Sequence, residues 1–203
     1  METEFKYSLK NGEVFDSIVE NEEINKMGLE AIEIIDMHAV YFDTEDEDLR
    51  KKGIAYRIRQ EDERCTATIK WDVNVQEGLH QREEFNLVVN DERFVEHPDI
   101  ELFISSDAYD VLHEAAGDKP LVATITMDYE RRQFKVDTGK SISCISVDEG
   151  AIHHIDGHTI PICELEIEWY YGDEDDFMAL ADFIKSKYEL TSENKSKLQR
   201  AFE

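Results

Sequence analysis

Charged and apolar residues alternate with a period of two along most of this chain, and the charges gather on one face of each alternating segment. Successive side chains of a β-strand point to opposite faces, so this alternation predicts strands that have one apolar and one charged face. The pattern recurs at residues 2–9, 31–44, 54–60, 64–72, 80–89, 121–137, 141–148 and 160–171. Eight such segments favour an antiparallel sheet or barrel.

Helices are predicted between and after these strands. The four segments are residues 13–27, 105–116, 173–187 and 193–202. Ser105 and Ser106 are suitable N-caps for the second, Gly117 ends it, and an acid-rich turn suits the start of the third. The predicted class is α+β. With three prolines and no Gly/Ser-rich linker, we expect residues 1–203 to form a single domain.

The charge balance limits the partners of this protein. The chain has 22 Lys and Arg against 48 Asp and Glu, a net charge of −26. Such a surface repels nucleic acid and anionic membranes, so we expect neither as a partner. Any anionic ligand must therefore meet a local cluster of bases. The start METEFKYSLK has no apolar signal region and no apolar run approaches the ~20 residues of a membrane helix, so we expect a cytoplasmic protein.

The charged faces of the predicted strands combine acids and bases in an unusual way. Glu164, Glu166 and Glu168 share one face, and their mutual repulsion requires a compensating cation. If the sheet closes into a barrel, these faces line an interior that cannot be a dry core. The charged residues expected in that interior are Glu2, Glu4, Arg57, Arg59, Lys70, Arg82, Glu164 and Glu166.

This mixture of charges favours one kind of ligand. Carboxylates suit hard divalent cations, whereas Arg and Lys suit phosphate oxygens. Together they indicate a site for a metal–polyphosphate complex. For any single strand, a half-buried sheet with a solvated outer face is the simpler interpretation, but the whole set of strands weakens it.

The segment Glu2-Thr-Glu4-Phe-Lys6 forms an ExExK signature that, with later blocks, resembles the CYTH superfamily, the triphosphate tunnel metalloenzymes. The later blocks are YFDTEDEDLRKKGIAYRIR, TATIKW, GLHQREEFN, DYERRQF, the Asp-x-Gly turn VDEG, PICELEIEWYYGD and NKSKLQRAF. They follow the family order over nearly the whole chain, and two of them look most like the bacterial inorganic triphosphatases. The resemblance implies a closed antiparallel eight-stranded β-barrel with flanking helices, enclosing a charged tunnel.

The resemblance also implies a role for each matching charged residue. Mg²⁺ or Mn²⁺ would be bound by Glu2, Glu4, Glu164 and Glu166, with Glu168 assisting. Phosphate oxygens would be held by Lys6, Arg57, Arg59, Lys70, Arg82, Arg131 and Lys197. The catalytic set would be Glu4, Lys6, Arg59, Glu84 and Asp148, in which Glu84 and Asp148 orient bases or water. Arg132 is adjacent to Arg131, and a slip of one residue would exchange their faces.

The implied activity is metal-dependent hydrolysis of inorganic tripolyphosphate to pyrophosphate and phosphate, with water attacking the terminal phosphorus. Alternatives within the same fold are a class IV adenylate cyclase that makes cyclic AMP from ATP and a thiamine triphosphatase. A module that binds polyphosphate or divalent ions without turnover also stays open. The expected partner is a small-molecule triphosphate, and the expected state is a monomer or homodimer.

Other kinds of site have little support in the sequence. The three cysteines, Cys65, Cys144 and Cys163, are odd in number and form no CxxC pair, which disfavours disulfides and zinc. No GxGxxG, GxxxxGK or GxSxG motif is present. Surface positions are predicted for His153, His154 and His158. Barrel packing is predicted for Phe42, Tyr56, Trp71, Phe85 and Trp169.

Overall fold

A computed structural model describes residues 1–61, 64–90 and 97–202, and within them the side chains of all residues except 72 and 73. The strands are β1 (Glu2–Ser8), β2 (Glu33–Thr44), β3 (Ile54–Glu61), β4 (Arg64–Gln76), β5 (Leu79–Val88), β6 (Leu121–Asp137), β7 (Ser141–His154), β8 (Thr159–Gly172) and β9 (Thr191–Ser192). The helices are α1 (Glu13–Val19), α2 (Glu22–Asn25), α3 (Asp48–Lys51), the 3₁₀ turn η1 (Ile100–Phe103), α5 (Asp107–Ala116), α6 (Glu174–Lys187) and α7 (Lys197–Ala201).

Strands β1 to β8 close into an antiparallel barrel, which confirms the predicted fold class. Across the described residues the sheet has the order β5-β4-β3-β2-β6-β7-β8-β1, and pairing of β1 with β5 closes it. At this closure Glu2 lies opposite Arg82. The short strand β9 pairs with the end of β1, where Ser192 lies opposite Tyr7. The C-terminal segment is therefore attached directly to the first strand.

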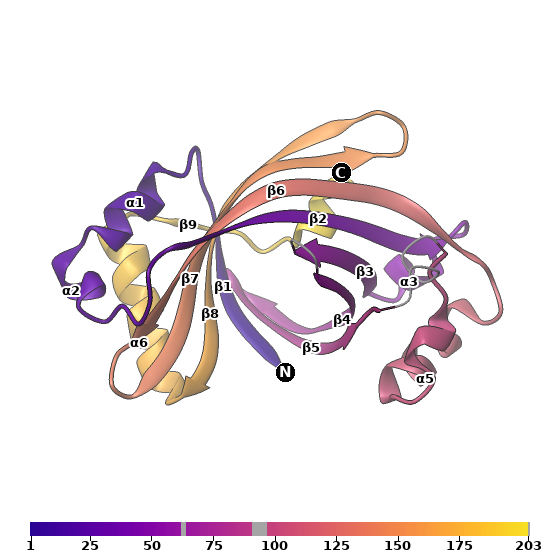
Figure 1. Cartoon of the computed structure of the whole chain (residues 1–203), viewed down its shortest axis with the longest axis horizontal. Coiled ribbons are helices and arrows are strands. Elements are labelled where there is room, and N and C mark those ends of the chain that lie inside the picture. The colour runs from indigo at the N-terminus through magenta and orange to yellow at the C-terminus, as the bar shows by residue number, and fades with distance from the viewer. Residues whose placement is uncertain (62–63, 91–96, 203) are drawn as a thin grey trace.

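Most apolar faces of the strands point outward, beneath the helices. Phe5 and Ile167 pack with Phe177 of α6 in one buried cluster that also includes α1 and α2. Tyr56 packs with Phe103 in a second cluster beneath η1 and α5. Figure 1 shows α1, α2 and α6 gathered at one end of the molecule and α5 at the other. Because the helices bury the apolar faces outside, the charged faces of the strands line the interior.

The predicted packing of the aromatic residues is confirmed. The second cluster buries Phe42 and Tyr56, and Trp71 and Phe85 pack against it partly buried. Trp169 packs against the first cluster in the same way. All three cysteines of the chain are free.

Several elements differ from the prediction, and the strand expected over 64–72 continues to Gln76. The helix expected over 13–27 is two helices, because the Asn21 side chain accepts hydrogen bonds from the Glu23 and Ile24 amides and starts α2 anew. The helix expected over 193–202 is only α7, because Ser196 and Gln199 form a capping box and residues 191–192 join the sheet.

Another difference lies in β7. The strand expected over 141–148 continues to His154, so the block VDEG lies inside β7 and is not a turn. A Cβ at Gly150 would lie 2.2 Å from the Asp128 carbonyl oxygen, so β7 and its neighbour β6 come unusually close at this position. The hairpin turn comes later, where the Gly157 amide donates to the His154 carbonyl. Among the described residues, no helix is long and apolar enough to cross a membrane.

Candidate functional site

A cavity of about 770 Å³ occupies the interior of the barrel. Among the described residues that line it, nine are basic and six acidic, so its wall has an excess of three positive charges in a chain of net charge −26. The basic residues are Lys6, Arg50, Arg57, Arg59, Lys70, Arg82, Arg131, Lys195 and Lys197. The acidic ones are Glu2, Glu4, Glu61, Glu84, Glu166 and Glu168. The local basic cluster that an anionic ligand requires is therefore present.

Most of the predicted site residues meet in this cavity. Its wall includes Glu2, Glu4, Lys6, Arg57, Arg59, Lys70, Arg82, Glu84, Arg131, Glu166, Glu168 and Lys197. The other two predicted residues, Asp148 and Glu164, are fully buried behind the wall. They lie under Lys197, which contacts both of their carboxylates.

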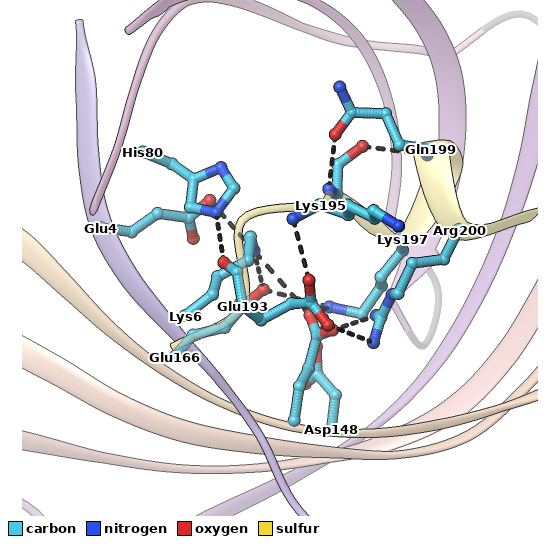
Figure 2. A network of polar contacts seen from close by, with 12 residues as sticks. Glu4, Lys6, His80, Asp148, Glu166, Glu193, Lys195, Lys197, Gln199 and Arg200 are labelled. Carbon is cyan, nitrogen blue, oxygen red and sulfur yellow. Dashed lines mark hydrogen bonds and ion pairs between the residues drawn. The ribbon is translucent and has the colours of Figure 1, made fainter. Parts of the chain in front are cut away.

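Lys6 is the centre of the acidic side of the site. Its ammonium group contacts Glu166, which lies opposite it on β8, and is 3.0 Å from a carboxylate oxygen of Glu4. Burial opposes the charge of Lys6, but Glu166 and Glu4 outweigh that effect and hold its pKa above the usual value. Figure 2 shows Glu4, Lys6 and Glu166 pointing toward one another.

Three buried carboxylates form a second cluster close to Lys6. Oxygens of Asp148, Glu164 and Glu166 lie within 4.8 Å of one another, a spacing that can hold a metal ion. Each of them already has cationic partners. Arg131 donates two hydrogen bonds of 2.7 Å to Asp148, and Arg200 contacts Glu164. Protein cations therefore neutralise this cluster.

Arg131 and Arg132 point to opposite faces of β6. Arg131 lines the cavity and also donates a 2.6 Å hydrogen bond to Glu166. Arg132 lies on the outer face, where it pairs with Asp16 and Glu149. The structure thus places Arg131, the predicted residue, in the cavity.

Three further carboxylates, Glu2, Glu4 and Glu168, line the cavity from β1 and β8. Glu4 lies opposite Glu168 in the β1–β8 ladder, and Glu2 precedes Glu4 on the same face. Burial and the charges of Glu2 and Glu4 raise the pKa of Glu168 to about 8. Among the described residues, Glu168 has no ion pair. Glu2 pairs with Lys70 and Glu4 with Lys6. Carboxylate oxygens are the donors that Mg²⁺ and Mn²⁺ prefer, so the residue types present fit the predicted metal.

Arg57 supplies the complementary feature, a cation that forms no ion pair with a carboxylate of the described residues. It lines the cavity and hydrogen-bonds with Tyr41, and within the described part of the chain no carboxylate oxygen lies within 4.0 Å of it. The buried Nε of Arg57 and that of Arg59 have no hydrogen-bond partner there. Buried donors normally have partners, so this part of the wall is suited to an anion.

Lys70 and Glu84 connect these two parts of the wall. Lys70 Nζ is 2.7 Å from both carboxylate oxygens of Glu2 and also pairs with Glu84. Burial favours the neutral form of Glu84, but Lys70 and Arg57 outweigh it and lower the pKa of Glu84 to about 2. Glu84 therefore stays ionised and holds Lys70 in place.

Some residues of the site were missing from the sequence prediction. Tyr41, Tyr129, Arg50 and Lys195 line the cavity, and His80 lies beside Arg82. His80, Arg82 and Glu84 alternate along β5, so the period-two pattern contained a signal for His80. The tyrosines gave no such signal, because aromatic residues are common on buried faces of strands.

Comparison with known proteins agrees with this geometry. The CYTH domain matches residues 1–202. An inorganic triphosphatase of Haemophilus influenzae is 26% identical over 163 residues, which are 80% of this chain and 44% of that protein. The chain thus spans less than half the length of this curated relative.

Two solved structures share the fold. A Hippeastrum protein assigned as an adenylyl cyclase, for which a dominant triphosphatase activity is described, has a TM-score of 0.73 at 18% identity, covering 100% of this chain and 97% of that one. A Bacillus halodurans protein assigned as an adenylate cyclase has a TM-score of 0.66 at 20% identity, covering 100% and 98%. At these identities the likeness shows the fold alone.

Proposed function

The chain belongs to the CYTH domain family, and from that premise we propose that it hydrolyses inorganic triphosphate to pyrophosphate and phosphate inside its barrel, with the help of a divalent cation. One observation carries the proposal. Arg57, a cation without a carboxylate partner among the described residues, shares a single cavity with Glu168, a carboxylate without an ion pair among the same residues. A ligand that satisfies both must carry negative charge and bring a cation, as a metal–triphosphate complex does.

The cation would be held by Glu2, Glu4 and Glu168, with Mg²⁺ and Mn²⁺ as the candidates. When bound, it supplies positive charge that offsets the triphosphate oxygens and makes water a better nucleophile. Cation binding would also relieve the repulsion that raises the pKa of Glu168.

The bases would bind the phosphate chain. Arg57 and Arg59 present donors that are free of partners within the described residues, and Lys70, Arg82, Arg131 and Lys197 extend the positive wall. Carboxylates hold several of these bases in place before substrate arrives, so little reorganisation is needed as charge develops on the transferring phosphoryl group. We assign Glu84 and Asp148 to this orienting role, since each forms close ion pairs with bases.

A second candidate function follows from the apolar part of the cavity. Met37, Ile54, Leu198 and Phe202 line it, and Arg50 lies over the Phe202 ring at 4.5 Å. An apolar wall with an aromatic ring is able to hold an organic group such as a nucleobase or thiamine. This feature favours ATP or thiamine triphosphate as alternative substrates.

One assay separates these candidates. The protein is incubated with tripolyphosphate, thiamine triphosphate or ATP, each with Mg²⁺ or Mn²⁺, while phosphate release and cyclic AMP are measured. We expect the highest kcat/KM for tripolyphosphate, with equal amounts of phosphate and pyrophosphate. Cyclic AMP from ATP would replace the proposal with cyclase activity, and binding without any product would leave a binding module.

A further inference from the structure

His80 is a fully buried histidine at the edge of the site. It lies on β5, two residues before Arg82, and opposite Glu4 in the closing β1–β5 ladder. Figure 2 shows its ring directed toward Glu193 in the segment that leads to α7. The proposed hydrolysis gives this imidazole no role in binding or catalysis.

The two hydrogen bonds of His80 determine its protonation state. Arg82 Nη2 lies 2.6 Å from His80 Nδ1, and a guanidinium can only donate, so Nδ1 must accept. His80 Nε2 lies 2.8 Å from the Glu193 carbonyl oxygen, which can only accept, so Nε2 must carry the proton. Both bonds exist together only in the neutral Nε2–H tautomer. Burial, with Lys6 and Arg82 nearby, lowers the pKa of His80, which is consistent with the neutral ring.

Arg82 needs such support because it contacts the opposite side of the barrel closure. Its Nη1 is 3.6 Å from a carboxylate oxygen of Glu4, one of the residues to which we assign the cation. A long arginine side chain has several rotatable bonds, and a fixed acceptor on one terminal nitrogen limits where the other points. His80 is well placed for this, since the same strand carries both residues on the same face.

The Glu193 carbonyl in turn is part of a rigid connection. The Glu193 amide donates to the Lys6 carbonyl at 2.9 Å, and the Asn194 side chain accepts from the Gly78 amide at 2.7 Å. The segment before α7 is thus fixed to β1 and to the β4–β5 turn. This gives the carbonyl a set position and makes it a reliable acceptor for the Nε2 proton.

We propose that His80 is a positioning residue, whose neutral Nε2–H tautomer is locked by the Glu193 carbonyl so that its Nδ1 lone pair aims the Arg82 guanidinium at Glu4 and the phosphate-binding wall. The kinetic test of this proposal rests on the proposed function, whereas the structural test does not. It concerns hydrogen-bond geometry and involves no change in the charge of His80.

The kinetic test compares three substitutions at His80. Asn places an amide oxygen where Nδ1 stood and keeps the acceptor for Arg82, whereas Gln reaches the Nε2 position, and Phe keeps neither bond. We expect His80→Asn to stay within about 3-fold of the wild-type kcat/KM, and His80→Gln and His80→Phe to lose about 100-fold, the cost of misplacing a site group. Rescue by Gln but not by Asn would overturn the proposal.

A double-mutant cycle with Arg82→Ala asks whether His80 acts through Arg82. The double variant His80→Phe/Arg82→Ala should lose no more kcat/KM than Arg82→Ala alone, because the positioned group is already gone. Losses that multiply would show that His80 acts by another route. Thermal unfolding verifies that each variant is folded, and His38→Asn, on the outer face of β2 where His38 pairs with Asp128, is the matched control with unchanged activity.

The structural test needs no activity. The ¹⁵N chemical shifts of the His80 imidazole, measured in the whole protein near neutral pH, should identify Nδ1 as unprotonated and Nε2 as protonated. The Nδ1–H tautomer or a charged ring would overturn the proposal. A wild-type protein that hydrolyses no triphosphate would defeat the proposed function, and the cycle would then be repeated with tripolyphosphate affinity as its readout.

Discussion

The ammonium group of Lys197 lies 2.6 Å from a carboxylate oxygen of Asp148, and this ion pair joins the C-terminal helix to β7. The same group contacts Glu164 and lies 3.0 Å from Glu166, both on β8. One lysine from a five-residue helix therefore contacts three buried carboxylates on two neighbouring strands. The short C-terminal helix is a structural part of the barrel.

Replacing Lys197 should destabilise the fold. In Lys197→Met the buried acids keep Arg131, Lys6 and Arg200 but lose their shared partner, and removing one member of a buried charge cluster costs about 3–5 kcal/mol. Urea unfolding measures the loss. Lys195→Met, at an exposed lysine two residues earlier, is the control and should change stability by less than about 1 kcal/mol. Equal stability of the two variants would contradict this account of Lys197.

Much of the site could be predicted because strand alternation is a rigid rule. Once β1 and β8 are strands, Glu2, Glu4 and Lys6 must share a face, as must Glu164, Glu166 and Glu168. Closure of the barrel then makes those faces internal. The direction of each side chain follows from the backbone alone, which is why most predicted residues do line the cavity.

Partners across the barrel could not be predicted, since they depend on depth and on side-chain reach. Glu164 and Glu168 belong to the same alternating row, yet Glu164 is buried under Lys197 and Arg200 while Glu168 lines the cavity without an ion pair among the described residues. Whether Arg57 reaches a carboxylate of the described residues likewise depends on the length and direction of the side chains across the cavity. The two-residue strand β9 was missed because so short a segment has no period to detect.

Arg131 and Arg132 are adjacent in the sequence but point to opposite faces of β6, so together they test whether the site lies inside the barrel. We expect Arg131→Ala to lower kcat/KM for tripolyphosphate about 100- to 1,000-fold, the usual effect of removing a preorganised donor. Arg132→Ala should stay within about 3-fold, because Arg132 pairs with Asp16 and Glu149 outside the barrel. Steady-state kinetics on both variants, after thermal unfolding confirms that they fold, decides the matter. A larger loss in Arg132→Ala would place the site on the outer face.

Arg57→Met should separate binding from stability. Since Arg57 has no carboxylate partner in the described part of the chain, its removal leaves no acid without a cation, and the free energy of unfolding should change by less than about 1 kcal/mol. Affinity for tripolyphosphate, measured by calorimetry, should nevertheless fall about 10- to 100-fold, as expected for a charge-assisted contact worth roughly 1.5–3 kcal/mol. Arg131→Met is the comparison and should lose stability as well, because Arg131 pairs with Asp148 and Glu166. Unchanged affinity in Arg57→Met would remove Arg57 from the phosphate site.

Glu168 should make the cation-free protein less stable as pH rises. Its pKa is about 8 in the fold and near the ordinary 4.5 in the unfolded chain, so the folded protein holds a proton that the unfolded chain has lost. This contribution to stability is complete below pH 4.5 and disappears as pH rises toward 8. In EDTA, Glu168→Gln should therefore be more stable than wild type at pH 8, by up to roughly 4–5 kcal/mol, and about equal at pH 4.5.

Adding a divalent cation at pH 8 should make the wild type more stable than Glu168→Gln. In the wild type, Mg²⁺ or Mn²⁺ bound by Glu2, Glu4 and Glu168 would offset the repulsion that the proton offsets at low pH, so the melting temperature at pH 8 should rise with cation concentration. Glu168→Gln has lost one carboxylate ligand and should show a smaller rise. Glu130→Gln, on the outer face of β6 away from the cavity, is the matched control and should respond like the wild type. An identical response of Glu168→Gln and wild type to the cation would exclude Glu168 as a ligand while leaving the pH effect intact.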